Sequence, residues 1–256
     1  MEMVLLCAGR GSRLGNVTDK KPKAMTEVHG IPIIKNTIKI LNELKSNNIK
    51  IIVGYEHKKF PEFQGVKKII NKNWDKTNMV GSYFLSINKD SFRDTVFIYG
   101  DIIVNKNVII NYVDKLDKKV GSILIDNNWF DYWSMRSVNP LNDAETCIVD
   151  ENDCLLELGK KINDDEIPKY QYTGIGFFPA SYQKKIYVDW VSELSLTNEG
   201  RNFYMTDIIN KLIKENYKFV VHKTSGKWLE IDTQTDLNLA YKLSKKTNEN
   251  ELIVLR

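Results

Sequence analysis

Apolar runs and segments of helical periodicity alternate along the first half of this chain. Residues 3–7 form a short apolar run ended by glycines, residues 31–44 repeat apolar side chains at helical spacing around Pro32, and residues 49–54 form a second buried run. Further strands are expected at 66–71, 95–101 and 121–126, and further helices at 80–87 and 106–116. This alternation predicts an α/β, Rossmann-like, mostly parallel mixed sheet with helices on both faces and ligands at the carboxyl ends of its strands.

The pattern changes after about residue 130. Two apolar runs flank the turn-rich residues 150–153, which predicts a small β-hairpin inserted beside the main sheet. Later strands are expected at 172–180, 218–223 and 228–232, and later helices at 181–194, 203–215 and 237–243. The aromatic run 129–135 is interpreted either as core or as a pocket wall. With 256 residues and no low-complexity linker, the chain is expected to form one domain.

Composition excludes several classes of protein. The formal net charge is only +4, from 37 basic and 33 acidic residues, which is too small for a dedicated nucleic-acid binder. The cysteines Cys7, Cys147 and Cys154 are odd in number and lack a CxxC spacing, so neither a disulfide framework nor a zinc site is expected. The sequence shows no signal peptide and no apolar stretch of about 18 residues. We therefore expect a cytoplasmic protein without nucleic-acid or membrane partners.

The sequence LCAGRGSRLG, residues 6–15, places glycines and arginines directly after the first expected strand. The dinucleotide fingerprint G-x-G-x-x-G fails by one position, because Leu14 stands where the third glycine belongs, and no P-loop lysine is present. Glycines let backbone N–H groups approach an anion, while Arg13 and, downstream in KKPKAM, Lys23 would supply cationic donors. The loop therefore predicts a polyphosphate site, with a tight turn bearing two solvated arginines as the alternative.

Two aspartates stand at the ends of expected strands. Asp101 ends the run IYGD and Asp232 ends the run WLEID, and an open α/β sheet exposes such positions to its ligand crevice. Carboxylate oxygens suit Mg²⁺, whose coordination is completed by substrate phosphates and water, so both aspartates are candidate Mg²⁺ ligands. A turn or helix cap is the alternative for each, since Asp232 stands shortly before Asp236 and a helical pattern.

The glycine loop together with PKAM resembles the L-x-A-G-x-G-x-R-[LM]…PK signature of nucleotidyltransferases that activate sugar 1-phosphates and related phosphomonoesters. Cys7 departs from the alanine that is more usual there. The G-D after the middle strand and the W-x-x-x-D-T-x-x-D pattern resemble the two metal-binding aspartates of that family, Asp101 and Asp232. The resemblance implies catalytic roles for Arg13 and Lys23. It also implies nucleotide contacts by Leu6, Ala8, Gly9, Arg10, Gly11, Ser12, Arg13 and Lys23.

The segment NKNWDKTNMVGSYFLSI resembles the corresponding part of cytidylyltransferases that act on phosphocholine-like substrates. The resemblance implies that Asn78, Met79 and Ser82 contact a cytosine base, while capping of the following helix is an equal alternative for Asn78. As a whole, the chain resembles the branch of these enzymes that acts on L-glutamine phosphate, in the phosphoramidate modification of bacterial capsules. Phosphocholine and hexose 1-phosphates stay open as acceptors.

The resemblance also implies a domain organisation and a reaction. A single nucleotidyltransferase domain would cover residues 1–246, with a nucleotide-binding part at about 1–128, an acceptor-binding part at about 129–246 and a C-terminal tail at 247–256. The reaction would transfer a cytidylyl group from CTP to a small phosphomonoester and release pyrophosphate, with Mg²⁺ as cofactor. The sequence leaves the oligomeric state open, a homodimer included.

The acceptor pocket is expected in the later half of the chain. A small zwitterionic phosphate needs cations for its anionic groups and an acidic or amide partner for its amine. The polar candidates are Arg136, Lys160, Glu199, Arg201 and Tyr204, each with a place on the solvated surface as its alternative.

The sequence fits other functions less well. A nicotinamide-dependent oxidoreductase is disfavoured by the displaced third glycine. A nucleotide-binding regulatory module would bind the nucleotide without releasing pyrophosphate. Hydrolase chemistry is disfavoured because no serine, histidine and acid arrangement stands out around His29, His57 and His222.

Overall fold

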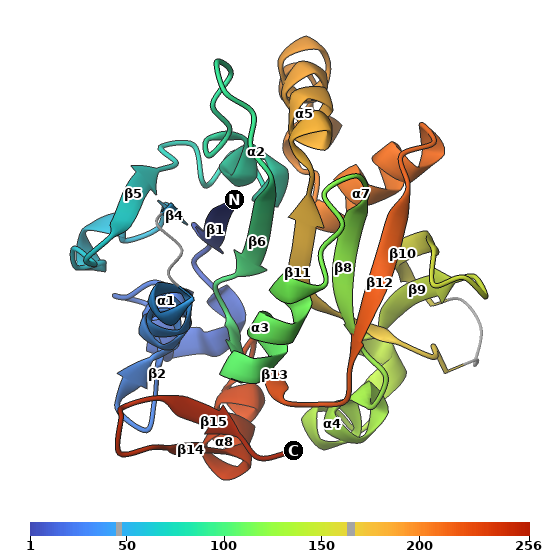
Figure 1. Ribbon diagram of the computed structural model, residues 1–256. Helices are drawn as coiled ribbons and strands as arrows, with labels where there is room; N and C mark the ends of the chain where they lie inside the picture. Colours follow the sequence, from blue (N-terminus) through green and yellow to red (C-terminus); the bar gives the residue numbers. More distant parts are fainter. Residues whose placement is uncertain (45–47, 163–166) are drawn as a thin grey trace.

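A seven-stranded mixed sheet forms the centre of the fold, in the order β12-β8-β11-β6-β1-β4-β5 (Figure 1). The computed structural model describes residues 1–44, 48–162 and 167–256. The strands are β1 (Glu2–Cys7), β4 (Ile49–Val53), β5 (Val66–Ile70), β6 (Thr95–Tyr99), β8 (Gly121–Asp126), β11 (Gln171–Phe178) and β12 (Phe219–Thr224). Neighbouring strands run parallel except at β11, which is antiparallel to both β6 and β8. This confirms the predicted mostly parallel α/β sheet.

Helices cover both faces of the sheet. Along β1, Met3 and Leu5 belong to one core and Val4 and Leu6 to the other, because successive strand side chains alternate between faces. On the first face lie α1 (Ile33–Glu43), α3 (Lys106–Asp114), α4 (Trp129–Arg136) and α8 (Gln234–Leu243). On the second face lie α2 (Met79–Phe84), α5 (Ala180–Ser192) and α7 (Met205–Lys214), with the short α6 (Asn198–Arg201) preceding α7 in the chain. No helix in the described ranges is long and apolar enough to cross a membrane.

Two-stranded ribbons complete the fold. They pair β2 (Glu27–Val28) with β3 (Ile31–Pro32), β7 (Ile102–Val104) with β13 (Trp228–Glu230), β9 (Glu145–Val149) with β10 (Leu155–Lys161), and β14 (Ser244–Lys246) with β15 (Leu252–Val254). The β9–β10 pair is the predicted hairpin. From the sequence, the aromatic run 129–135 is interpreted either as core or as a pocket wall. It forms most of α4 and places Trp129 and Tyr132 in the core.

Residues 247–256, expected as a C-terminal tail, include β15, which packs against the body of the fold beside α8 (Figure 1). Leu252 and Val254 are buried in the core on the first face. Their backbone N–H groups donate to the side-chain oxygens of Asn36 and Asn105, each at 2.7 Å. The segment is thus held by both apolar contacts and hydrogen bonds.

Asp126 at the end of β8 ties β13 and Arg256 to the main sheet. Its fully buried carboxylate accepts hydrogen bonds from the backbone N–H of Gly226 (2.9 Å), the indole N–H of Trp228 (2.8 Å) and the guanidinium of Arg256 (2.7 Å). Because Trp228 begins β13, these bonds fix the strand that carries Glu230.

Replacing Asp126 with alanine is expected to lower the free energy of unfolding by about 3–5 kcal/mol, because it leaves the largely buried Arg256 without its counter-charge. Urea denaturation followed by circular dichroism measures this loss. Glu62→Ala is the control: Glu62 forms an exposed ion pair with Lys68, so its loss should cost less than about 1 kcal/mol. Equally small losses in both variants would show that Asp126 does not anchor β13.

Candidate active site

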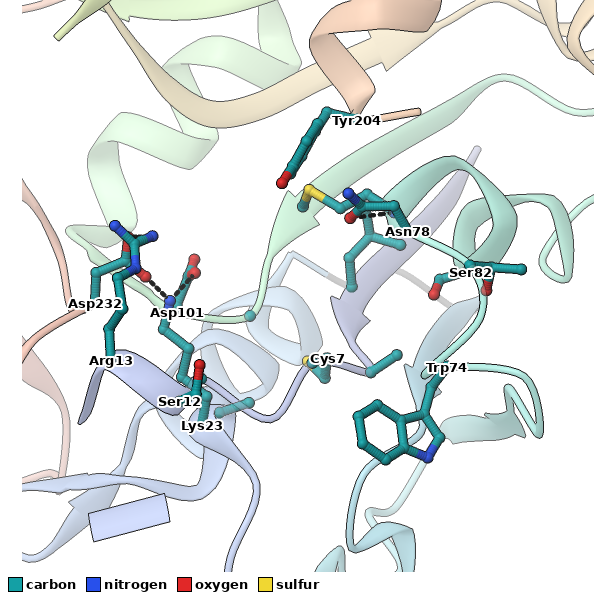
Figure 2. Close-up of a pocket in the computed structure, with 18 residues that line it drawn as sticks. Cys7, Ser12, Arg13, Lys23, Trp74, Asn78, Ser82, Asp101, Tyr204 and Asp232 are labelled. Atoms are coloured by element: carbon teal, nitrogen blue, oxygen red, sulfur yellow. Dashed lines mark hydrogen bonds and ion pairs between the residues drawn. The ribbon is translucent and has the colours of Figure 1, made fainter. Parts of the chain in front are cut away.

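The carboxyl ends of β1 and β6 open onto a cavity of about 330 Å³. It is lined by the glycine loop after β1, the turn after β6 and the segment that leads into α2. Figure 2 shows Arg13, Lys23, Asp101 and Asp232 gathered at one end of the cavity, and Trp74 and Ser82 at the other. This is the place where an open α/β sheet binds its ligands.

Gly11 lets the glycine loop and Lys23 lie close together. Its backbone is left-handed, with φ +72°, and a Cβ there would lie 2.7 Å from the Cβ of Lys23. The hydroxyl of Thr18 donates to the carbonyl oxygen of Gly11 at 2.9 Å and holds this loop conformation. The stem of Lys23 therefore crosses the loop and carries its ammonium group to the ends of the strands.

Lys23 lies between two aspartates. Its Nζ donates to Oδ2 of Asp101 at 2.6 Å and to Oδ1 of Asp232, while Nη2 of Arg13 donates to Oδ2 of Asp232. The side chains of Lys23 and Asp232 are only 13% and 10% exposed, so the contact between them is shielded from water, whereas the side chain of Arg13 is exposed. The structure thus brings together two cations and two aspartates that lie far apart in the sequence.

The charges around Lys23 outweigh the effect of its burial. Burial by itself lowers the pKa of Lys23, but Asp101, Asp232 and Glu230 raise it further, so the net shift is upward. Burial likewise opposes ionisation of Asp232, yet Lys23 and Arg13 bring its pKa below the ordinary value. Both side chains are therefore charged at neutral pH.

Glu230 is a third carboxylate at this point and is not among the residues predicted from the sequence. One oxygen each of Asp101, Glu230 and Asp232 lies within 4.8 Å of the others. The antiparallel pairing of β13 with β7 sets Glu230 opposite Ile102, directly after Asp101. The two-residue spacing of Glu230 and Asp232 is the available sequence signal, because alternate residues of a strand share one face.

The three carboxylates fit a divalent cation. Their oxygens are the hard ligands that Mg²⁺ prefers, and Oδ1 of Asp101 is buried without a hydrogen-bond partner among the described residues. Burial raises the pKa of Glu230; Arg136 lowers it, and the negative charges of Asp232 and Asp101 raise it again, so the net shift is upward. A divalent cation would relieve this crowding of negative charge.

Helix α8 is capped by Thr233 and Asp236, the neighbours of Asp232, and not by Asp232 itself. The hydroxyl of Thr233 accepts from the backbone N–H of Asp236 at 3.2 Å, and Asp236 accepts from the N–H of Thr233 at 2.8 Å, which forms a capping box for α8. Asp236 also accepts from the N–H of Asp232 at 3.0 Å. The carboxylate of Asp232 is therefore left to face Lys23 and Arg13.

The far end of the cavity is lined by Thr77, Asn78, Met79 and Ser82. Asn78 also caps α2, since its Oδ1 accepts from the N–H of Met79 at 2.9 Å. The hydroxyl of Ser82 accepts from Nδ2 of Asn71 at 3.0 Å. These bonds fix small polar groups in positions where they can meet the edge of a planar base.

Most of the predicted glycine-loop residues line this cavity: Leu6, Ala8, Gly9, Gly11, Ser12 and Arg13. Arg10 does not. Its guanidinium forms an ion pair with Asp19 at 3.2 Å and lies 5.6 Å from the ring centroid of Tyr55. Arg10 therefore supports the loop from outside rather than from within the cavity.

Cys7 lines the same cavity beneath the loop. Burial, and after it the negative charge of Asp101, raises the pKa of its thiol well above the ordinary value. The thiol packs closely against the β6–β7 turn, where a Cβ on Gly100 would lie 2.5 Å from the sulfur. Cys7 thus acts as a small, uncharged wall residue.

A second cavity of about 380 Å³ adjoins the first. Both cavities are lined by Arg13, Lys23, Met79, Asp101, Tyr204 and Asp232. The other walls of the second cavity carry the carboxylates of Asp143, Glu145, Asp207 and Glu230 and the rings of Tyr99, Tyr172, Trp133 and Trp228. Carboxylates beside aromatic rings suit a ligand with a positive charge.

Tyr204 is the one predicted acceptor residue that lines these cavities. Arg136 lies behind the wall, with its side chain only 5% exposed, and donates to Glu230 at 2.9 Å and to Asp236 at 2.8 Å. Arg136 therefore contacts Glu230 from behind and does not line either cavity.

The other three acceptor candidates lie elsewhere on the surface. Lys160 forms an ion pair with Glu157 on the β9–β10 hairpin. Glu199 is exposed on α6, and Arg201 donates to the carbonyl of Ser195 at 3.0 Å. The acids of the second cavity, above all Glu145, are the polar groups that the sequence does not single out.

The chain is similar to known proteins of one family. Residues 3–128 match the MobA-like NTP transferase domain. Over 254 residues the chain is 32% identical to the CTP:phosphoglutamine cytidylyltransferase of Campylobacter jejuni, covering 93% of this chain and 98% of that protein. It is 30% identical over 116 residues to the choline-phosphate cytidylyltransferase of Haemophilus influenzae, covering 43% of this chain and 48% of that protein.

A solved structure shares the fold. The CTP:phosphocholine cytidylyltransferase from Streptococcus pneumoniae matches with a TM-score of 0.73 at 22% identity, over 94% of this chain and 97% of that one. The similarity extends over nearly the whole chain. The chain therefore belongs to the MobA-like NTP transferase family and is a nucleotidyltransferase of the cytidylyltransferase kind.

Proposed function

We propose that this enzyme transfers the cytidylyl group of CTP to a small phosphorylated acceptor that also carries a positive charge, and releases pyrophosphate. L-Glutamine phosphate is the preferred acceptor, supported by the 32% identity to a phosphoglutamine cytidylyltransferase over nearly the full length of both chains. The resemblance extends the proposal to the phosphoramidate modification of capsular polysaccharide.

One observation carries the proposal: two cavities meet at Arg13, Lys23, Asp101 and Asp232. A nucleotide in the first cavity would place its phosphates at this junction, with its base toward Asn78 and Ser82. An acceptor in the second cavity would bring its phosphate to the same junction from the other side. Two reacting groups held in this way react as if they were part of one molecule.

The chemistry requires little beyond positioning and charge neutralisation. A phosphate oxygen of the acceptor attacks the α-phosphorus of CTP, a new P–O bond forms, and the bond to the leaving pyrophosphate breaks. The acceptor phosphate is already ionised near neutral pH, so no side chain needs to remove a proton. Arg13 and Lys23 hold the phosphates and oppose the repulsion between the two anions.

Asp101, Glu230 and Asp232 would hold Mg²⁺. When bound there, the ion supplies positive charge to the phosphates and so assists the transfer. Arg136 keeps Glu230 directed toward the other two carboxylates.

The second cavity favours an acceptor that carries an amine over the phosphate of an uncharged sugar. Asp143, Glu145 and Asp207 bring negative charge to one region, and burial followed by the charges of Asp143 and Asp207 raises the pKa of Glu145 to about 7. An ammonium ion would stabilise the ionised form of such a carboxylate through a charge-assisted hydrogen bond. A hexose would offer it only hydroxyl groups.

A substrate panel tests the proposed function. Pyrophosphate release is measured for CTP, UTP, dTTP and ATP, each with L-glutamine phosphate, phosphocholine and glucose 1-phosphate. We expect turnover with CTP and L-glutamine phosphate to exceed every other pair. Turnover with UTP or dTTP and the hexose phosphate, but not with CTP, would refute the proposed substrates.

The pH dependence of acceptor binding should report Glu145. Because its pKa is about 7, the side chain is protonated below that pH and ionised above it, so the KM for L-glutamine phosphate should fall as the pH rises from about 6 to about 8. Glu145→Gln should remove this dependence of KM on pH and raise the KM at pH 8 about tenfold or more, as expected for loss of a charge-assisted contact.

Ionisation of the acceptor phosphate occurs equally in both proteins, so the difference between the two pH profiles isolates Glu145. Glu157→Gln is the matched control, because Glu157 lies on the same hairpin but pairs with Lys160 outside the cavity. Identical profiles in the wild type and Glu145→Gln would remove Glu145 from acceptor binding.

A further inference from the structure

Trp74 is an aromatic side chain in the wall of the first cavity. It lies between β5 and α2, and Figure 2 shows it near Ser82, away from the ion-pair end formed by Lys23 and Asp232. The ring is partly exposed, while the phosphate-binding cations lie at the opposite end. It therefore lies where the base of a nucleotide would be expected.

The backbone around Trp74 is fixed by hydrogen bonds from a buried asparagine. Oδ1 of Asn71, which is only 3% exposed, accepts from the N–H of Asn73 at 2.9 Å. Nδ2 of Asn71 donates to the hydroxyls of Thr77 at 3.1 Å and Ser82 at 3.0 Å. The hydroxyl of Thr77 in turn donates to the carbonyl of Asn73 at 2.9 Å. The loop is thus held in a set position relative to α2.

Trp74 also packs against the two residues that follow β4. The Cβ of Trp74 lies over Gly54, and a Cβ added at Gly54 would come within 2.4 Å of it, so only glycine allows this packing. The ring of Tyr55 meets it edge to face, with centroids 5.3 Å apart and planes at 69°. The hydroxyl of Tyr55 donates to the carbonyl of Asp19 at 2.7 Å, and Asp19 also pairs with Arg10 of the glycine loop. Trp74 is therefore oriented before a ligand arrives.

We propose that Trp74 is the side chain against which the nucleotide base packs, and that it supplies affinity for the base independently of the phosphate contacts made by Arg13 and Lys23. The inference rests on the proposed function in taking the first cavity as the nucleotide site. An aromatic ring held in place loses little freedom when a base stacks on it, and every base has a π face. Stacking of this kind raises affinity about 5- to 150-fold, which corresponds to about 1–3 kcal/mol.

Calorimetric titration with CTP and with inorganic tripolyphosphate separates base from phosphate binding. Trp74→Ala should weaken CTP binding about 5- to 150-fold and leave tripolyphosphate binding unchanged. Trp74→Phe, the conservative variant, should retain CTP affinity within about threefold of the wild type. Unchanged CTP binding in folded Trp74→Ala would overturn the proposal, and so would an equal loss for both ligands, which would mean that Trp74 shapes the phosphate loop.

A second measurement does not depend on the folding of the alanine variant. CTP should quench tryptophan fluorescence in the wild type, and the quenching should be absent in Trp74→Phe. Quenching of equal size in both proteins would overturn the proposal. The four nucleoside triphosphates are compared in the wild type and in Trp74→Phe: preference for another base would refute the proposed substrate and leave the Trp74 inference standing, because stacking does not depend on which base is bound.

Discussion

The ion pairs of Lys23 with Asp101 and Asp232 join the parts of the molecule on which the site depends. They connect the segment after the glycine loop, the turn after β6 and the end of β13. A buried ammonium group is stable here because carboxylates surround it, and the crowded carboxylates are stable because Arg13 and Arg136 also lie against them. The junction of the two cavities thus has matched charges of both signs, which suits a reaction between two anions.

The glycine-loop side of the first cavity can be predicted from the sequence because its signals are local. Glycines directly after an apolar strand, and an aspartate at the end of another, place the loop and Asp101 at the same edge of a parallel sheet. The second cavity depends on distant contacts. Arg136 meets Asp236, which is 100 residues away in the chain, and no local pattern shows that Arg136 lies behind the wall while Glu145 lies within it.

The elements of the fold likewise differ in how well the sequence predicts them. Strands of five to eight residues and amphipathic helices give clear patterns, so the main sheet and most of the helices that cover it follow from the sequence. Helix α4 is not predicted, because its aromatic run shows no helical period. β7 and β15, which the sequence does not predict, have only three residues each, too few to show a period. β13 lies within the strand expected at 228–232, but its pairing with β7 depends on a partner elsewhere in the chain. The pairing of β7 with β13 is also what brings Glu230 to Asp101, so the missed strand and the missed carboxylate have one cause.

The binding of Mn²⁺, a paramagnetic substitute for Mg²⁺, tests most directly whether Asp101, Glu230 and Asp232 form a cation site. It can be followed by electron paramagnetic resonance in the wild type, Asp101→Asn, Asp232→Asn and Lys23→Met. We predict that both aspartate variants fold normally and bind Mn²⁺ about tenfold or more weakly. Lys23→Met should bind it at least as well as the wild type, because the ammonium group that shares those oxygens is gone. Wild-type Mn²⁺ affinity in both folded aspartate variants would contradict the assignment.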